Sequence, residues 1–281
     1  LYVNTTGSSN VAMGRDALQA NTTASNNTAI GHSSLYANTT GTENTALGAN
    51  ALDANTTANS NTAVGYSSLG ANTTGTLNVA LGKDALRDNT TAGANTAVGT
   101  VSMRLNTTGA SNTAVGYGSL DTNTTGGNNV AIGRDSLTAN TTASANTAVG
   151  YAAGASNTTG GLTAFGYRAA YSNTTGNTQS AFGTDALYFT TTGADNSAFG
   201  AFALKANTTG ANNTAVGYNS LTANTTGTQG TAVGRNAGAA NTTGNYNTFI
   251  GDGSGDANTT GASNTAIGQD SLGANTTGAT N

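Results

Sequence analysis

The sequence predicts an all-β fold, a parallel β-solenoid or β-roll with about 17 residues per coil and about 16 coils. The triplet Asn-Thr-Thr occurs sixteen times, almost always seventeen residues apart. A large apolar residue follows nine positions after the triplet Asn in the full-length repeats, and the next residue is always Gly. A fixed short period over a whole chain is typical of stacked repeats, in which each repeat needs its neighbours to bury a core.

The composition agrees with an ordered repeat array. The 281 residues include 40 Gly but no Pro, Cys or Trp, and only 7% are charged, whereas globular chains average about 25%. Disordered chains usually carry high net charge or abundant Pro, but here the net charge is −4. The absence of Cys excludes disulfides and thiolate metal sites. Without a basic stripe we expect no nucleic-acid partner, and without a long apolar run no direct membrane insertion.

One continuous repeat array is expected over residues 1–281. Its irregularity is slight: one residue is missing between Asn157 and Asn173, and Thr190 replaces one triplet Asn. Because the chain begins and ends within a repeat, we expect it to be an excerpt of a longer fibre protein.

Each repeat is expected to contain a short strand, as in Asn61-Thr-Ala-Val-Gly65. Frequent Gly, Asn and β-branched residues disfavour a helix, while alternating residues bounded by Gly and Asn fit a strand. Alternation places Thr62 and Val64 on one face and Ala63 on the other. The Thr and Val positions are expected to point inward with the later Leu, exemplified by Leu69, and the Ala outward.

This assignment predicts an oligomer interface. An outward face restricted to Ala and Gly favours close approach of another backbone, although these residues would also suit a tight coil. Only about two large core residues per coil leave a thin margin against the conformational entropy of folding, which association would offset. The expected interface residues are Ala29, Gly31, Ala46, Gly48, Ala63, Gly65, Ala114 and Gly116.

Three segments, Asn10-Val-Ala-Met-Gly14, Asn61-Thr-Ala-Val-Gly65 and Asn129-Val-Ala-Ile-Gly133, resemble the Ser-Val-Ala-Ile-Gly-type motif of trimeric autotransporter adhesin heads. This resemblance implies left-handed parallel β-rolls wound as homotrimers. The repeats are also similar to arrays in bacterial surface fibres and phage tail-fibre-like proteins. The repeat is longer here than in the adhesin heads because of the added Asn-Thr-Thr segment, which leaves the trimer geometry open.

The Asn-Thr-Thr rows admit three interpretations. Stacked Asn amides could form structural ladders. Alternatively, every copy satisfies the N-glycosylation rule. Regular Thr rows could also bind ice, although adjacent Thr5 and Thr6 should point to opposite faces of a strand. The candidate glycosylation sites are Asn4, Asn21, Asn38, Asn55, Asn72, Asn89, Asn106, Asn123, Asn140, Asn157, Asn173, Asn207, Asn224, Asn241, Asn258 and Asn275.

Catalytic and metal-binding signals are weak. The one histidine, His32, occupies a variable turn position, and no nucleophile–base pair or phosphate loop is apparent. We therefore expect no enzymatic activity and no cofactor. Asp252, Ser254 and Asp256 offer oxygens at alternate positions, but calcium requires six to eight ligands, so a plain acidic turn is the favoured interpretation.

An aromatic cluster surrounds the missing residue. It could repack the core locally or form a ligand or receptor patch, since aromatic residues are favoured in binding hot spots. Its members are Phe165, Phe182, Phe199, Phe189, Phe202, Tyr171 and Tyr188.

These observations predict a structural shaft of an extracellular fibre or filament, adhesive or surface-presenting and without catalysis. The expected assembly is a homo-oligomer, with a trimer favoured over a filament. The alternatives are a phage tail-fibre shaft on a virion and a ligand-binding module for host or surface glycans, a receptor or ice.

Overall fold

The computed structural model describes residues 2–281, and Leu1, the first residue of the predicted array, lies outside them. The chain divides into two compact units, one ending at Ala145 and the other comprising Asn146–Asn281. Each unit is a parallel β-solenoid, which confirms the predicted fold class. Residues 2–281 contain strands and turns only, and hence no helix that could cross a membrane.

One three-residue strand occurs in each repeat. In the first unit the strands are β1 (Val11–Met13), β2 (Thr28–Ile30), β3 (Thr45–Leu47), β4 (Thr62–Val64), β5 (Val79–Leu81), β6 (Thr96–Val98), β7 (Thr113–Val115) and β8 (Val130–Ile132). In the second they are β9 (Thr147–Val149), β10 (Thr163–Phe165), β11 (Ser180–Phe182), β12 (Ser197–Phe199), β13 (Thr214–Val216), β14 (Thr231–Val233), β15 (Thr248–Ile250) and β16 (Thr265–Ile267).

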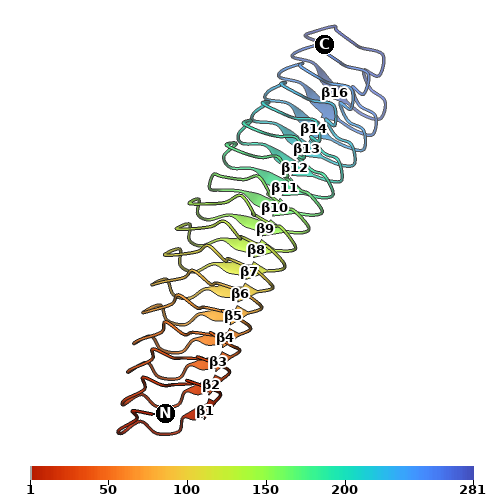
Figure 1. The fold of residues 1–281 in the computed structure, drawn as a ribbon. Helices are drawn as coiled ribbons and strands as arrows, with labels where there is room; N and C mark the ends of the chain where they lie inside the picture. Colours follow the sequence, from red (N-terminus) through yellow and green to blue (C-terminus); the bar gives the residue numbers. More distant parts are fainter. Residues whose placement is uncertain (1) are drawn as a thin grey trace. The chain divides into compact units, whose positions relative to one another are not determined.

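Within each unit, every strand pairs in parallel with the next (Figure 1). The register places equivalent residues of successive repeats side by side, as where Ala97 pairs with Ala114. At the shorter repeat the offset is one residue less, and Ala148 pairs with Ala164. The sheet therefore keeps its register, and the missing residue is absorbed in the bend between Thr159 and Leu162, where Gly161 has φ +82°.

The interior of each coil is narrow, which reverses the expected faces of the strand. Ala63, the middle residue of β4, is fully buried, whereas Thr62 and Val64 on either side are partly or largely exposed. The apolar core consists of the Ala row of the strands and a buried Leu row, exemplified by Leu52 and Leu69. Because the Leu side chains already fill the space across from the sheet, the strand can place only a small residue inward.

Two rows of Asn complete the interior. Nδ2 of Asn72, a triplet Asn, donates to Oδ1 of Asn55 at 3.1 Å and to the Gly75 carbonyl at 3.0 Å. Asn61, just before its strand, donates from Nδ2 to the same carbonyl at 2.9 Å, and its Oδ1 accepts from the backbone N–H of Asn78 at 2.9 Å. Both rows thus satisfy the buried backbone groups of the bend, which would otherwise cost free energy.

The Gly after each strand is required by its conformation. Gly116 has φ +131°, and a Cβ atom there would lie 2.7 Å from the carbonyl carbon and oxygen of Gly133 in the next coil. Side chains are excluded both by the backbone angle and by the close stacking of coils. This explains why no other residue occurs at this position in any repeat.

Candidate interaction surfaces

The predicted Ala/Gly interface is wrong, because the alanines lie inside the coil. Ala29, Ala46, Ala63 and Ala114 have no exposed surface. The accompanying glycines, Gly31, Gly48, Gly65 and Gly116, are half-buried and stack against the backbone of the next coil of the same chain. Small residues are required here because the coil is narrow. This was the alternative explanation of the Ala and Gly positions in the sequence analysis.

The exposed face of the strands carries the first and third residue of each strand, and we call this surface the sheet strip. Its third position is apolar in every strand, and many of these side chains are exposed, among them Leu47, Leu81 and Val216. The first position is Thr, Val or Ser. Since exposed apolar residues in contiguous patches mark interaction sites, the sheet strip is the strongest candidate for an interface.

Three Phe residues give the sheet strip of the second unit a distinct segment. The ring centroids of Phe165 and Phe182 lie 5.2 Å apart, and those of Phe182 and Phe199 lie 4.8 Å apart, with nearly parallel planes. Phe165 is 38% exposed and Phe199 41%. These residues therefore lie on the surface and do not repack the core, which corrects the first interpretation of this cluster.

A second aromatic group lies on the turns of the same unit. The Arg168 guanidinium lies 4.8 Å from the ring centroid of Tyr167 and 4.6 Å from that of Tyr188. The same guanidinium donates to both carboxylate oxygens of Asp185, at 3.0 and 2.9 Å. The Asp185 side chain is only 4% exposed and also faces the Lys205 ammonium at 3.5 Å. Its contacts are satisfied within the chain, so this group cross-links successive coils.

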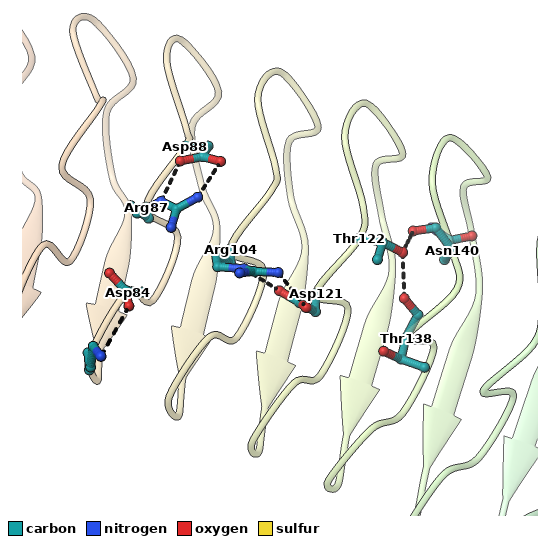
Figure 2. Close-up of polar contacts among 9 residues, drawn as sticks. Asp84, Arg87, Asp88, Arg104, Asp121, Thr122, Thr138 and Asn140 are labelled. Carbon is teal, nitrogen blue, oxygen red and sulfur yellow. Dashed lines mark hydrogen bonds and ion pairs between the residues drawn. The ribbon is translucent and has the colours of Figure 1, made fainter.

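Among the described ion pairs of the first unit, one joins neighbouring coils and the others join sequence neighbours (Figure 2). Arg104 donates to both carboxylate oxygens of Asp121 at 3.0 and 3.1 Å, across one coil boundary. Arg87 pairs with its sequence neighbour Asp88 at 2.7 Å, and this hydrogen bond raises the pKa of the Arg87 guanidinium. Partly exposed pairs of this kind contribute little stability, and we assign them no binding role.

The candidate glycosylation sites are buried along most of the chain. The triplet Asn residues from Asn21 to Asn258 are fully or almost fully buried, and the exceptions are Asn4 and Asn275. In the regular repeats their Nδ2 atoms donate to the Asn Oδ1 of the preceding coil and to a backbone carbonyl. The ladder interpretation is confirmed, and the folded chain does not present these amides as accessible acceptors.

The two Thr residues of the triplet have different roles. The first, as in Thr39, donates its hydroxyl to the carbonyl of Thr56 in the next coil at 3.1 Å. The second, as in Thr40, is exposed. One of the two hydroxyl rows is therefore used within the solenoid, and ice binding by the triplet stays an untested prediction.

The calcium candidates do not converge. Ser254 is buried and its hydroxyl donates to the Ala266 carbonyl at 2.9 Å. Asp252 pairs with Arg235 at 2.8 Å, and Asp256 is exposed. The acidic-turn interpretation is therefore favoured by the geometry. Residues 2–281 contain neither a group of three acidic, His or Cys side chains arranged for a metal nor a surface pocket.

His32, the one histidine, is exposed and its Nε2 lies 2.6 Å from Nη2 of Arg15 in the preceding coil.

Comparison of the chain with protein-family models and with curated proteins finds no match. Among the surfaces of the described residues, the sheet strip is the strongest candidate for an interaction with another molecule.

Proposed function

We propose that this chain is a structural repeat shaft of an extracellular fibre or filament, and that copies associate through the sheet strip. The observation that carries this proposal is the apolar third position of the strands, which lies on the surface in repeat after repeat. Side chains such as Leu47, Leu81 and Ile132 are 39–46% exposed. A shaft that remained a monomer would leave this row in water, at a cost of about 25 cal/mol for each Å² of apolar surface.

The area of the sheet strip suits a specific interface. Three residues extend about 10 Å along a strand, and neighbouring strands lie about 4.8 Å apart. Eight strands on each unit give roughly 380 Å² per unit, or roughly 770 Å² for the two strips of one copy taken separately. Specific protein interfaces bury about 800 Å² per partner. A closed ring covers the strip of every copy. Among closed rings a homotrimer is favoured by the resemblance of the repeats to trimeric adhesin heads, and a filament is the second candidate.

The adhesive or surface-presenting role and the extracellular location rest on the resemblance of the repeats to those of surface fibres, with a virion tail fibre as the alternative. A stack of coils joined by Asn ladders suits a spacer that holds other segments away from a surface. An antibody against the folded chain should label intact producer cells if the chain is displayed outside, whereas labelling only after the cells are permeabilised would contradict this location.

Self-association is tested by charges placed on the sheet strip. The double variant Leu47→Asp/Leu81→Asp should sediment as a monomer under conditions where the wild-type chain is an oligomer. The matched control, Thr40→Asp/Thr74→Asp, places the same charges in the same two repeats but on the exposed bend, and should remain oligomeric. A monomeric wild-type chain, or equal behaviour of the two variants, would contradict the proposal.

A further inference from the structure

The sheet strip alone does not fix how two copies align along the solenoid. Successive repeats present nearly the same pair of residues, as in Thr96 with Val98 and Thr113 with Val115. A copy shifted by one or several coils therefore retains most contacts. Such a shift converts a closed cyclic assembly into an open, staggered filament. A shaft with one defined assembly requires a feature that distinguishes one coil from another.

The Phe segment of the second unit is such a feature. Phe165, Phe182 and Phe199 occupy the third position of β10, β11 and β12, where all other described strands carry Val, Leu, Ile or Met. Their rings are nearly parallel, with interplanar angles of 4° and 9°. They form a raised ridge, three coils long, on a strip whose third position is otherwise aliphatic or Met.

The first strand position, next to the Phe residues, indicates that the size of side chains on this face is limited. The first strand position is Ser at Ser180 and Ser197, and Thr or Val in all other described strands. Both Ser residues thus lie beside a Phe on the same face of the strand. A face open to water has room for a methyl group next to a ring. Thr163, beside Phe165, keeps this methyl group. Its loss at the two other coils of the ridge is expected where another surface covers both rows.

We infer that Phe165, Phe182 and Phe199 set the axial register in which copies of this chain associate, so that equal coils meet at equal height. This inference rests on the self-association proposed above and deepens it. At equal height the ridges meet one another, and aromatic pairs form in addition to the burial of their area. A shifted copy places the ridge against the lower Val and Ile rows, where it holds the strips apart or leaves voids.

The register can be measured by disulfide formation, because the chain has no Cys of its own. Thr214→Cys and Thr248→Cys place thiols on the sheet strip two coils apart, a separation of about 9.6 Å. Disulfides require Cα atoms within about 7 Å of each other. The two variants, carrying different tags, are mixed, unfolded, refolded together and oxidised. Mixed-tag disulfides between the two positions then report shifted pairs, and same-position disulfides report equal height.

The test variant makes the strip uniform by Phe165→Val, Phe182→Val, Phe199→Val, Ser180→Thr and Ser197→Thr. Disulfides between equal positions should exceed shifted ones by roughly tenfold with the ridge present, and this preference should fall toward one in the uniform variant. Sedimentation should change from a discrete species to assemblies that grow with concentration. The control Val216→Ile/Val233→Ile keeps the ridge and should preserve both results.

The outcomes separate the two proposals. An oligomer with the same disulfide ratio and the same sedimentation in the wild-type and uniform chains overturns the register inference but leaves self-association standing. A wild-type chain that remains monomeric overturns self-association, and the register inference with it.

Discussion

Phe249 and Gly255 are complementary in the core of the second unit. Phe249 occupies the middle of β15, where all other strands carry Ala, and it is completely buried. A Cβ atom on Gly255 would collide with ring atoms Cδ1 and Cε1 of Phe249, and one on Gly238 would lie 2.7 Å from Cδ2. Both glycines stand where regular repeats carry the buried Leu, as at Leu221. One large ring on the sheet thus replaces Leu side chains from two successive coils.

This relationship predicts a compensated exchange. Phe249→Ala should lower the free energy of unfolding by about 3–5 kcal/mol, because it leaves a cavity between two coils without Leu. Gly255→Leu alone should also destabilise through overpacking. The triple variant Phe249→Ala/Gly238→Leu/Gly255→Leu recreates the regular core and should recover most of the loss. Urea denaturation of the four proteins provides the measurement, and additive losses in the triple variant would contradict the relationship.

A break in the Asn ladder predicts a stabilising substitution. Thr190 replaces the triplet Asn, so it offers no amide N–H to Asn173, whose buried Oδ1 has no hydrogen-bond partner. Thr190→Asn should donate to this oxygen as in the regular coils, and raise the free energy of unfolding by about 1 kcal/mol. Thr192→Asn, two residues away at an exposed position outside the ladder, is the control. Equal melting temperatures for Thr190→Asn and the wild type would refute the role of the missing donor.

The repeat length and strand positions were predictable because they follow from the spacing of Gly and Asn alone. Which face of each strand points into the coil was not predictable. Alternation shows that Thr62 and Val64 share a face, but it does not show whether that face lies inside. The interior width decides this, and it depends on the Leu row across the coil. Phe249 could have indicated that the Ala row lies inside. It is the one large residue of that row, and it coincides with the replacement of Leu by Gly at 238 and 255.

The candidate site was predicted less well than the fold for a related reason. The Asn-x-Thr motif is local, whereas burial of Asn72 depends on the coils on either side. The second Asn row, exemplified by Asn61, recurs at the same period and could have indicated that amides line the interior. The surface position of Phe165 was predicted only as the second interpretation, a ligand or receptor patch, because its row was assigned to the core.

Burial of the triplet Asn predicts an unmodified ladder. A glycan on Nδ2 of Asn72 would remove a donor to Asn55 or Gly75 and would require space that the interior lacks. When the chain is secreted from a glycosylating host, the folded, protease-resistant fraction should carry no glycan at Asn72. Mass spectrometry of its peptides measures this directly. Asn275, half-buried at the end of the ladder, serves as the internal comparison, and a folded fraction glycosylated at Asn72 would contradict the ladder.

Asp53 predicts a small pH dependence of stability. Burial raises the pKa of the Asp53 carboxyl above its ordinary value of 3.8, against the lowering effect of hydrogen bonds from its own backbone N–H and that of Ala54. The folded chain therefore binds this proton more tightly than the unfolded chain. Its contribution to stability is present below pH 3.8 and is lost as the pH rises through the folded pKa.

Asp53→Asn removes this titration. Its melting temperature relative to the wild type should increase as the pH rises from 3 to 7, and Asp256→Asn, at an exposed position, controls for the loss of one charge. A pH-independent difference between Asp53→Asn and the wild type would show that this carboxyl does not contribute in this way.

Substitutions at Gly116, which follows a strand, and at Gly118, two residues later, should differ sharply in their effect on stability. Gly116→Ala places a Cβ atom against the Gly133 backbone at φ +131°, and should lower the free energy of unfolding by at least about 2 kcal/mol. Gly118 has φ +62°, an angle that Asn50 and Asn219 adopt at the equivalent position of other repeats. Its added Cβ would meet only the flexible Asp135 carboxylate, so Gly118→Asn should change stability little. If both substitutions cost the same in urea denaturation, close stacking of the coil backbones would not be the reason for the invariant Gly.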